Sequence, residues 1–474
     1  MIKLKVVTNV EKFENDFYDL VCAFDPLLVF DKQDGELLFV ECINNGYYQV
    51  KISYRNSLVY QDSKEREDGL NELLDVRAFK RFAKRSLYIV LKDLAGVELP
   101  YGSLTGIRPT KIYYDLLSEN KDPKRELSEY YLVSDKKIEL LSRIIETQKG
   151  IYSFGDGYDA FANIPVCPTR CAYCSFIAET YSHAKKHLEK YAENVNRDIS
   201  TQFSMDLGNR RAIYVGGGTP TAIDDKDLQT ILSAFRSNGE EFTVEAGRPE
   251  TFTKEKARIL KDNGVTRISI NPQTFKESTL SLIGRSHTVA DIYQAYERAK
   301  NYDFDVNMDL IAMLPEESVQ DFINSVDTAI SLEPANITVH TLSVKRGSTF
   351  NYYGMRSDAV NDAFKMVDYA YSALTQNGYS PYYTYRQKNT FGRLENVGYA
   401  KPKKACVYNV DIMEETHTVH ASGAGAISKT VCQEVKDGAS NIRIERLSEI
   451  KEVKGYNERI DELIQKKFDF FAKR

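Results

Sequence analysis

The sequence has no long apolar run, no excess of basic residues and few cysteines, and each absence excludes a class of protein. No apolar stretch approaches the roughly 18 residues of a membrane-spanning helix. The first twenty residues lack the apolar core and cleavage site of a secretory signal. The 63 basic and 68 acidic residues give a formal charge of −5, which excludes a nucleic-acid binder that works by bulk charge. We therefore expect a cytoplasmic protein with no membrane span and no nucleic-acid partner.

The cysteines are too few for a disulfide framework, since the 474 residues contain only seven. In the cytoplasm such residues are reduced thiols or metal ligands, and their spacing separates the two roles. Three of them, Cys167, Cys171 and Cys174, fall within eight residues in the string CPTRCAYC. The others are scattered, and we interpret them as small buried hydrophobes: Cys22, Cys42, Cys406 and Cys432.

The chain divides into three parts by its pattern of apolar residues. Residues 1–150 mix strand and helix signals without paired catalytic groups, and we expect a small N-terminal α+β accessory domain. Residues 151–345 alternate short apolar runs with amphipathic stretches, a rhythm that indicates βαβ units and a parallel sheet. Residues 346–474 change rhythm, with a helix over 358–376, short strands near 405–408 and 417–427 and a last helix near 456–471. We expect a C-terminal α+β domain that covers the substrate.

The repeating region predicts six parallel strands, which suit either a doubly wound sheet or a partial barrel. In both architectures the chemistry lies at the carboxyl ends of the strands, where the polar and glycine-rich residues of this region fall. The predicted strands are residues 159–164, 212–215, 242–245, 265–270, 305–311 and 337–342.

The spacing C-x3-C-x2-C after the first of these strands favours an iron–sulfur cluster. Thiolates are soft ligands that suit zinc and iron–sulfur clusters. A structural zinc site needs four ligands, and only His183 or His187 on the next helix could complete it, so a Cys3His zinc site remains as an alternative. Three cysteines on one loop more naturally hold three irons of a [4Fe–4S] cluster and leave the fourth iron open to an exogenous ligand.

At this point the sequence resembles the radical S-adenosylmethionine (SAM) enzymes. The resemblance implies a (β/α)6 partial barrel whose three cysteines hold the cluster and whose open iron binds SAM. Gly216–Pro220, in the string GGGTPT, follows the second strand and resembles the motif that holds the SAM amino group. The spelling of that string resembles the oxygen-independent coproporphyrinogen III oxidases (coproporphyrinogen dehydrogenases), and segments such as YGSLTGIRPTK and LENVGYAKP resemble their HemZ-type branch, which carries an extra N-terminal domain.

Further motifs continue the resemblance in order and imply a set of site residues. Glu245 matches the acidic residue that contacts SAM after the third strand, and Arg285 follows Gln273 by twelve residues, as in the family. Asp309 lies in a D-L-I-x-x-L-P string, and Gly423–Ile427 matches a late glycine-rich strand. The resemblance implies that Arg285, Gln273 and Asp309 have catalytic roles. It implies that the following residues bind the cofactor: Phe161, Tyr173, Gly217, Gly218, Thr219, Glu245, Gln273, Arg285, Asp309 and Ile427.

Each of these residues also has a purely structural interpretation. Glu245 and Asp309 could cap strand ends, although charged residues at that end of a βα repeat more often face the site. Arg285 could pair with a surface carboxylate, which is a weak contact. The glycines could serve a tight turn, and His340 fits a core histidine as well as a functional one and is left out of the predicted catalytic set.

The sequence departs from the family at several positions. Phe161 stands where a tyrosine is more usual, which keeps the ring and loses the hydroxyl. Asn163 occupies a position that is often His or Gly, and Met313 stands where Gly is usual. These changes should spare cluster binding and bear mainly on the substrate side.

The resemblance implies oxidative decarboxylation of the propionates of coproporphyrinogen III to vinyl groups, giving protoporphyrinogen IX. A substrate with several carboxylates needs cationic partners, and the candidates are Arg285, Arg386, Arg393 and Lys345. The reaction would also require an external electron donor and acceptor. The alternatives are a radical SAM enzyme acting on another tetrapyrrole, such as a haem-handling or methyl-transferring relative, a non-enzymatic haem-binding or haem-trafficking protein, and a zinc-bound structural protein.

Overall fold

The computed structural model describes residues 2–25, 27–66, 69–174, 179–343, 359–387, 390–436 and 439–473, which form two compact units. The first unit takes the described residues of Met1–Arg143, Arg356–Val360 and Arg386–Leu394, and the second takes the rest. In the described part of the chain no helix has the length and apolar character needed to cross a membrane. The division into three domains predicted from the sequence is finer than these two units and stays a prediction.

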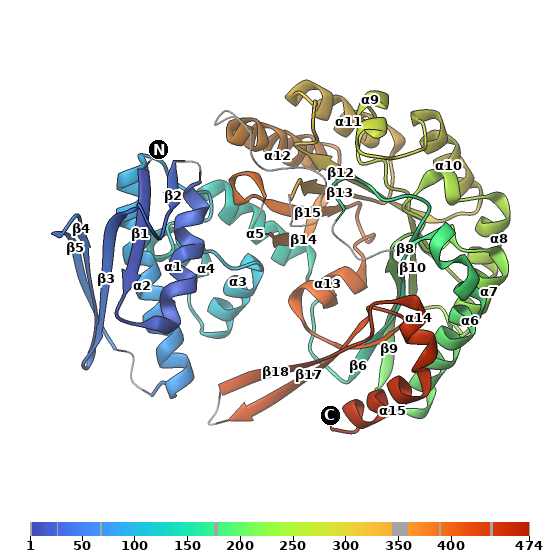
Figure 1. Cartoon of the computed structure of the whole chain (residues 1–474), viewed down its shortest axis with the longest axis horizontal. Helices are drawn as coiled ribbons and strands as arrows, with labels where there is room; N and C mark the ends of the chain where they lie inside the picture. Colours follow the sequence, from blue (N-terminus) through green and yellow to red (C-terminus); the bar gives the residue numbers. More distant parts are fainter. Residues whose placement is uncertain are drawn as a thin grey trace. The chain divides into compact units, whose positions relative to one another are not determined.

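The first unit is a five-stranded sheet covered by helices, in the order β2-β1-β3-β4-β5 (Figure 1). Strand β1 runs parallel to both of its neighbours, whereas β3, β4 and β5 form an antiparallel meander. Phe17 of α1 and Phe82 of α2 bury their rings against the sheet. The elements are β1 (Ile2–Thr8), α1 (Glu14–Val21), β2 (Leu28–Phe30), β3 (Glu36–Asn44), β4 (Tyr47–Tyr54), β5 (Ser57–Glu65), α2 (Glu72–Ala95), α3 (Pro109–Ser118), α4 (Pro123–Arg125) and α5 (Asp135–Thr147), the last of which runs into the second unit.

The second unit is built on an eleven-stranded sheet in the order β14-β15-β13-β12-β11-β10-β9-β6-β16-β17-β18. Its six central strands are all parallel and follow one another in sequence order across the sheet. They are β6 (Gly157–Ile164), β9 (Asn209–Gly217), β10 (Glu241–Glu245), β11 (Arg267–Ser269), β12 (Asp305–Ala312) and β13 (Asn336–Thr341). The six predicted strands are thus confirmed, and the fold is the predicted (β/α)6 arrangement with an open sheet.

Helices between these strands form the outer layer of the sheet (Figure 1). Their starts are fixed by the sequence: Thr288 and Asp291 form a reciprocal capping box at α10, and Ser318 and Asp321 form one at α11. The helices are α6 (Tyr181–Ser200), α7 (Asp225–Ser233), α8 (Lys254–Asp262), α9 (Glu277–Leu282), α10 (Val289–Asn301) and α11 (Val319–Leu332), and the short strands β7 (Val166–Cys167) and β8 (Glu179–Thr180) lie between β6 and α6.

The C-terminal part of the chain extends the sheet at both edges. Strand β15 pairs antiparallel with β13, whereas β16 pairs parallel with β6 and leads into the hairpin of β17 and β18. The remaining elements are α12 (Ala359–Gln376), β14 (Ser380–Arg386), β15 (Glu395–Ala400), α13 (Val407–Glu414), β16 (Thr418–Ser422), β17 (Ile427–Lys436), β18 (Ala439–Ser448), α14 (Val453–Glu458) and α15 (Ile460–Phe471).

Helix α13 corrects one prediction, because the strand expected near residues 405–408 is the start of this helix. It lies on the inner face of the sheet, where the ring of Tyr408 stacks on Tyr214 at 4.4 Å and on Phe161 at 6.1 Å between centroids. This helix therefore fills the interior that the curved sheet would otherwise leave open.

A buried ion pair fastens the last helix to the sheet. Lys467 of α15 is fully buried, and its Nζ lies 2.5 Å from Asp198 of α6 and 3.4 Å from Glu449. It also donates to the carbonyl of Ala421 in β16 at 2.6 Å. Two buried carboxylates thus depend on one cation, which makes Lys467 a strong determinant of local stability.

Candidate functional site

The cysteine loop begins where β6 and β7 end, at the carboxyl end of the central sheet. Cys167, Cys171 and Cys174 are all half-buried. Burial raises the pKa of Cys167, the hydroxyl of Thr219 opposes this from 3.5 Å, and the neighbouring thiols Cys174 and Cys171 raise the pKa further. The thiols of Cys171 and Cys174 are therefore close enough to act on the pKa of Cys167.

The zinc alternative gains no support from the described residues. Among them, no three His, Cys, Asp or Glu side chains are arranged to hold a metal ion directly. The side chain of His183 is 80 % exposed and lies 3.9 Å from Glu179. A fourth protein ligand for the cysteines is thus not provided by this histidine.

The cysteine loop packs against the segment that follows α9. The Ala172 amide donates to the carbonyl of Ile283 at 3.0 Å, and Thr169 Oγ1 donates to the carbonyl of Gly284 at 3.2 Å. Arg248, which the sequence analysis did not single out, donates to Cys171 Sγ at 3.3 Å. It directly follows the Glu-Ala-Gly string, at a strand end that already carried a predicted ligand, and this position was the available signal.

The glycine motif after β9 brings its backbone against the segment that leads to the cysteines. The Gly218 amide donates to the carbonyl of Ile164 at 2.9 Å, and the Thr219 amide donates to that of Val166 at 2.7 Å. Gly217 has a φ of +112°, and a Cβ at this position would overlap Oδ1 of Asn163. The glycines here are required both by conformation and by space.

Glu245, at the end of β10, is joined to the same motif. Tyr214 of β9 donates a hydrogen bond of 2.6 Å to its Oε1. Burial raises the pKa of Glu245 to about 7, and nearby Asp309 adds to this, although the hydrogen bonds from Tyr214 and the Gly217 amide oppose it. The structure therefore brings Gly217 and Glu245, two predicted SAM contacts, into direct interaction.

Asp309 of β12 lies beside His340 of β13, with 3.7 Å between Asp309 Oδ2 and His340 Nε2. Burial tends to raise the pKa of Asp309, but the interactions with His340 and with Asn307, whose amide donates at 2.8 Å, outweigh it and lower the pKa. The hydroxyl of Tyr385 lies 3.3 Å from His340 Nδ1. His340, left out of the predicted set, therefore belongs to the polar groups at this strand end.

Gln273 is placed by the backbone rather than by a side-chain contact. Its φ is +67°, its amide donates to the carbonyl of Asp309 at 2.9 Å, and its own carbonyl accepts from the Ile311 amide at 2.9 Å. Two predicted residues, Gln273 and Asp309, are thus held next to each other at the ends of β11 and β12.

Arg285 is 8 % exposed, and its guanidinium donates hydrogen bonds to the backbone just after two strands. Its Nη1 donates to the carbonyls of Gly247 at 3.1 Å and Asn271 at 2.6 Å, and its Nη2 donates to the hydroxyl of Tyr173 at 3.3 Å. Burial raises the pKa of Tyr173. Arg285 thus ties the cysteine loop, through Tyr173, to the loops after β10 and β11.

The last two predicted cofactor contacts lie at the β6 edge. The ring of Phe161 stacks on Tyr214 with 6.2 Å between centroids. Ile427 begins β17, and its side chain is 49 % exposed. The glycine-rich turn before it lies against the cysteine side of the sheet, because Asn163 Nδ2 donates to the carbonyl of Ala424. A role for Ile427 itself stays a prediction.

The other candidate propionate partners belong to the first unit or lie outside the described residues. Arg386 belongs to the first unit, where it donates to the carbonyls of Leu104 at 2.7 Å and Arg393 at 3.1 Å and lies over the ring of Tyr101. Arg393 belongs to the same unit, and Lys345 lies outside the described residues. Their roles as propionate clamps stay predictions.

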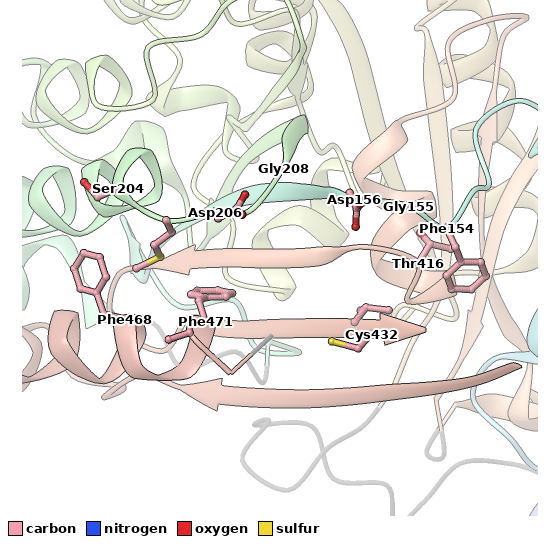
Figure 2. A pocket seen from close by; sticks show the side chains of 13 residues that line it. Phe154, Gly155, Asp156, Ser204, Asp206, Gly208, Thr416, Cys432, Phe468 and Phe471 are labelled. Carbon is pink, nitrogen blue, oxygen red and sulfur yellow. The ribbon is translucent and has the colours of Figure 1, made fainter. Parts of the chain in front are cut away.

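A separate pocket of about 920 Å³ opens at the amino-terminal end of β6 and β9 (Figure 2). Phe468 and Phe471 of α15, Cys432 of β17 and the acidic Asp156 and Asp206 line it. None of the predicted site residues lines this pocket, and in parallel α/β sheets the chemistry lies at the opposite, carboxyl end of the strands. We therefore assign the reaction to the cysteine end.

The residues at the cysteine end fit a [4Fe–4S] cluster with SAM. Three half-buried thiols share one loop, and the half-buried acid Glu245 lies next to the glycine backbone of Gly217. Within the described residues, Nε of Arg285 and Oδ1 of Asn271 are buried without a hydrogen-bond partner. Such polar atoms suit a site that takes up a polar ligand.

Comparison with known proteins gives consistent matches. The pattern of the Radical SAM superfamily matches residues 164–329. The chain is 35% identical over 421 residues to the oxygen-independent coproporphyrinogen-III oxidase-like protein HemZ of Bacillus subtilis, covering 84% of this chain and 83% of the relative. It is 31% identical over 199 residues to the heme chaperone HemW of the same organism, covering 40% of this chain and 52% of that relative. The structure of the radical SAM enzyme coproporphyrinogen III oxidase (HemN) from Escherichia coli aligns with a TM-score of 0.49 and 17% identity, over 66% of this chain and 72% of that one.

Proposed function

Because the chain belongs to the radical SAM superfamily and, within it, to the family of the HemZ oxygen-independent coproporphyrinogen-III oxidase-like protein, we propose that it oxidatively decarboxylates propionate side chains of coproporphyrinogen III. Each turnover would remove a hydrogen atom, CO2 and one electron and leave a vinyl group, and two turnovers would give protoporphyrinogen IX. The resemblance deduced from the motifs is confirmed at the level of the family.

The family's cofactors are a [4Fe–4S] cluster and SAM. When bound, they supply a 5′-deoxyadenosyl radical that abstracts the substrate hydrogen. In this chain Cys167, Cys171 and Cys174 would hold the cluster. Glu245 would accept a hydrogen bond from the SAM amino group, and the Gly217 backbone would lie against the same ligand. Tyr214 supports this role because it fixes the orientation of the Glu245 carboxylate.

The polar groups at the ends of β11 to β13 would position the substrate. Arg285 and Gln273 would keep the strand-end loops in place, and the Asp309 carboxylate, oriented by His340, would accept a hydrogen bond from the bound ligand. The fixed geometry matters because the reacting carbon must lie next to the radical, and a misplacement of about 1 Å can cost on the order of a hundredfold in rate.

The observation that supports the proposal is that the glycine motif and the cysteine loop contact each other. Thr219 Oγ1 of the motif lies 3.5 Å from Cys167 Sγ, and Gly217 of the same motif interacts with Glu245. A ligand that contacts Glu245 and the glycine backbone would therefore also reach an open iron at the cysteines.

The activity would take place in the cytoplasm, with an external electron donor and acceptor. Three thiolate ligands require reduced cysteines, which favours a reducing compartment. The donor would supply the electron that SAM cleavage needs, and the acceptor would take up the electron that the substrate loses when CO2 is released.

A second candidate function is haem binding without catalysis, because part of the chain matches proteins named heme chaperones. Anaerobic incubation of the reconstituted protein with SAM, reductant and coproporphyrinogen III, followed by mass spectrometry, separates the candidates. Vinyl products together with 5′-deoxyadenosine support the decarboxylase. A methylated product would indicate a methyl-transferring relative, and stoichiometric haem binding without SAM cleavage would indicate a carrier.

A further inference from the structure

Arg248 is a buried cation with one of its donors directed at a predicted cluster ligand. It follows β10 and is 2 % exposed. Its Nη1 donates to Cys171 Sγ at 3.3 Å, and its Nη2 donates to Thr169 Oγ1 at 2.8 Å and to Ser286 Oγ at 3.3 Å. A buried charge is retained only where partners compensate for its lost hydration, and one of these partners is a cysteine sulfur.

Glu250 holds the guanidinium from the other side. Its Oε1 accepts from Arg248 Nε at 2.9 Å and from Ser286 Oγ at 3.1 Å, and its Oε2 lies 2.9 Å from His287 Nδ1. Burial tends to raise the pKa of Glu250, but the hydrogen bond with His287 and the charge of Arg248 outweigh it and lower the pKa to about 2. Glu250 is therefore an anion at neutral pH. Its bond to Arg248 Nε orients the guanidinium so that Nη1 points toward Cys171.

Cys167 and Cys171 differ in the kind of hydrogen-bonding group that lies beside the sulfur. Cys167 lies 3.5 Å from the neutral hydroxyl of Thr219, whereas Cys171 receives a hydrogen bond from a cation. A hydrogen bond from a charged group is about twice as strong as one between neutral groups. Of these two cysteines, Cys171 therefore receives the stronger hydrogen bond.

We propose that Arg248 is a positioning residue that raises the reduction potential of the cluster through its hydrogen bond to the sulfur of Cys171. Reduction adds an electron to the cluster, and a donor cation at a ligand sulfur stabilises the more negative, reduced form. The inference rests on the cluster-binding part of the proposed function and does not depend on the identity of the tetrapyrrole. It means that this chain sets how readily its cluster accepts the electron used to cleave SAM.

A purely mechanical role for Arg248 makes a different prediction. Since Arg248 also bonds Thr169 and Ser286, it could merely fasten the cysteine loop to its surroundings. Loss of a fastener would lower the iron content or the stability of the protein, but clusters that assemble would keep their potential. The reduction potential of assembled clusters therefore separates the two roles.

The experiment is a redox titration of anaerobically reconstituted protein, followed by electron paramagnetic resonance, with iron and sulfide content measured in parallel. The variants are Arg248→Met, which removes the charge at similar length, and Arg248→Lys, which keeps the charge and loses the planar fork. The matched control is Arg258→Met on α8, because the Arg258 side chain is 59 % exposed and pairs only with surface carboxylates among its described contacts, Glu255 and Asp262.

For Arg248→Met we expect the ratio of reduced to oxidised cluster at a fixed potential to fall about tenfold, which is a downward shift of about 59 mV for a one-electron couple. Arg248→Lys should shift the potential less, and Arg258→Met should match wild type. An Arg248→Met protein with full iron and an unchanged potential would overturn the proposal. If that variant loses its iron, Arg248→Lys decides: a lowered potential supports the proposal, and an unchanged potential, or loss of iron here too, overturns it.

The wild-type protein tests the proposed function separately. Wild type that holds four irons but forms no vinyl product would refute the decarboxylation and leave the comparison of potentials intact. Wild type that assembles no iron–sulfur cluster would refute both.

Discussion

Tyr214 donates a hydrogen bond of 2.6 Å to Glu245, and this contact links the second and third strands of the central sheet at the end where they meet the cysteine loop. The same carboxyl group interacts with the Gly217 amide. Burial is the main cause that raises its pKa to about 7. A proposed SAM ligand thus titrates in the physiological range, and its orientation depends on a neighbouring phenol.

Replacement of Glu245 by Gln should weaken SAM binding about ten- to a hundredfold at pH 8. The change keeps the shape of the side chain and removes one charge-assisted hydrogen bond, which is worth roughly 1.5–3 kcal/mol. Isothermal calorimetry on protein with an intact cluster measures the effect. Tyr214→Phe serves as a graded companion, because it leaves the carboxylate and removes only the group that orients it. Equal affinity of Glu245→Gln and wild type would remove Glu245 from the SAM site.

The affinity for SAM should depend on pH because the carboxylate form of Glu245 is the one that pairs with an ammonium group. A pKa of about 7 means that the carboxylate is lost as the pH falls through 7. We expect affinity to fall by up to about tenfold for each pH unit below 7. Glu245→Gln should abolish this dependence, and a variant that retains the wild-type profile would assign the titration to another group.

Replacement of Arg285 by Lys should spare the cluster and uncouple SAM cleavage from product formation. Lysine has one nitrogen and cannot bond the Gly247 and Asn271 carbonyls and the Tyr173 hydroxyl with the geometry of a guanidinium. We expect the ratio of vinyl product to 5′-deoxyadenosine to fall on the order of a hundredfold, as misplacement by about 1 Å can produce. A wild-type ratio in the variant would mean that Arg285 has only a structural role.

Replacement of Gly217 by Ala should disrupt SAM binding through steric overlap with Asn163. The control is Gly239→Ala, because Gly239 also has a positive φ, +90°, but its added Cβ would meet nothing within 4 Å. Both variants suffer the cost of a left-handed backbone, of order 1–2 kcal/mol. Only Gly217→Ala should lose SAM affinity by calorimetry, and equal losses in both would point to general destabilisation.

Replacement of Lys467 by Met should lower the free energy of unfolding by about 3–5 kcal/mol, because Asp198 and Glu449 are left buried without their cation. Lys466→Met is the adjacent control, since Lys466 is 52 % exposed and pairs with Glu462 at the surface. We expect it to change stability by no more than about 0.5 kcal/mol. Urea unfolding followed by circular dichroism measures both. Similar midpoints for the two variants would show that the buried pair contributes little.

The sequence was most informative about the candidate site residues that lie at the ends of the parallel strands. Glu245 and Gly217 were predicted as SAM contacts from the family motifs that they resemble, and this role stays a prediction. The structure brings them together because a parallel sheet places consecutive strand ends side by side. The helix at Val407–Glu414 could not be recognised, because its polar residues Asn409, Asp411 and Glu414 are mixed with apolar ones around the circumference, which removes the periodicity that identifies a surface helix. The run around Ala405–Tyr408 therefore resembled a short buried strand.

Arg248 shows a different limit of the sequence. Its partners Cys171 and Ser286 are 77 and 38 residues away, so its burial and its contact with a cysteine are results of tertiary packing. Its place at a strand end that carries Glu245 was a signal for function, but the string VEAGRPE does not reveal that its side chain is buried. In the same way, the sequence could suggest Arg386 as a carboxylate partner, but only the structure places its guanidinium on the Leu104 carbonyl.

The parallel pairing of β6 with β16 has a consequence for the order of events during protein synthesis. Tyr158 of β6 pairs with Thr418 of β16, about 260 residues later in the chain. At about 5–20 residues per second, a ribosome needs about 13 to 52 s to supply the second strand after the first. Until then β6, which leads directly into Cys167, keeps one edge of its backbone unpaired. A nascent chain that ends before β16 therefore presents the three thiols next to an incomplete sheet.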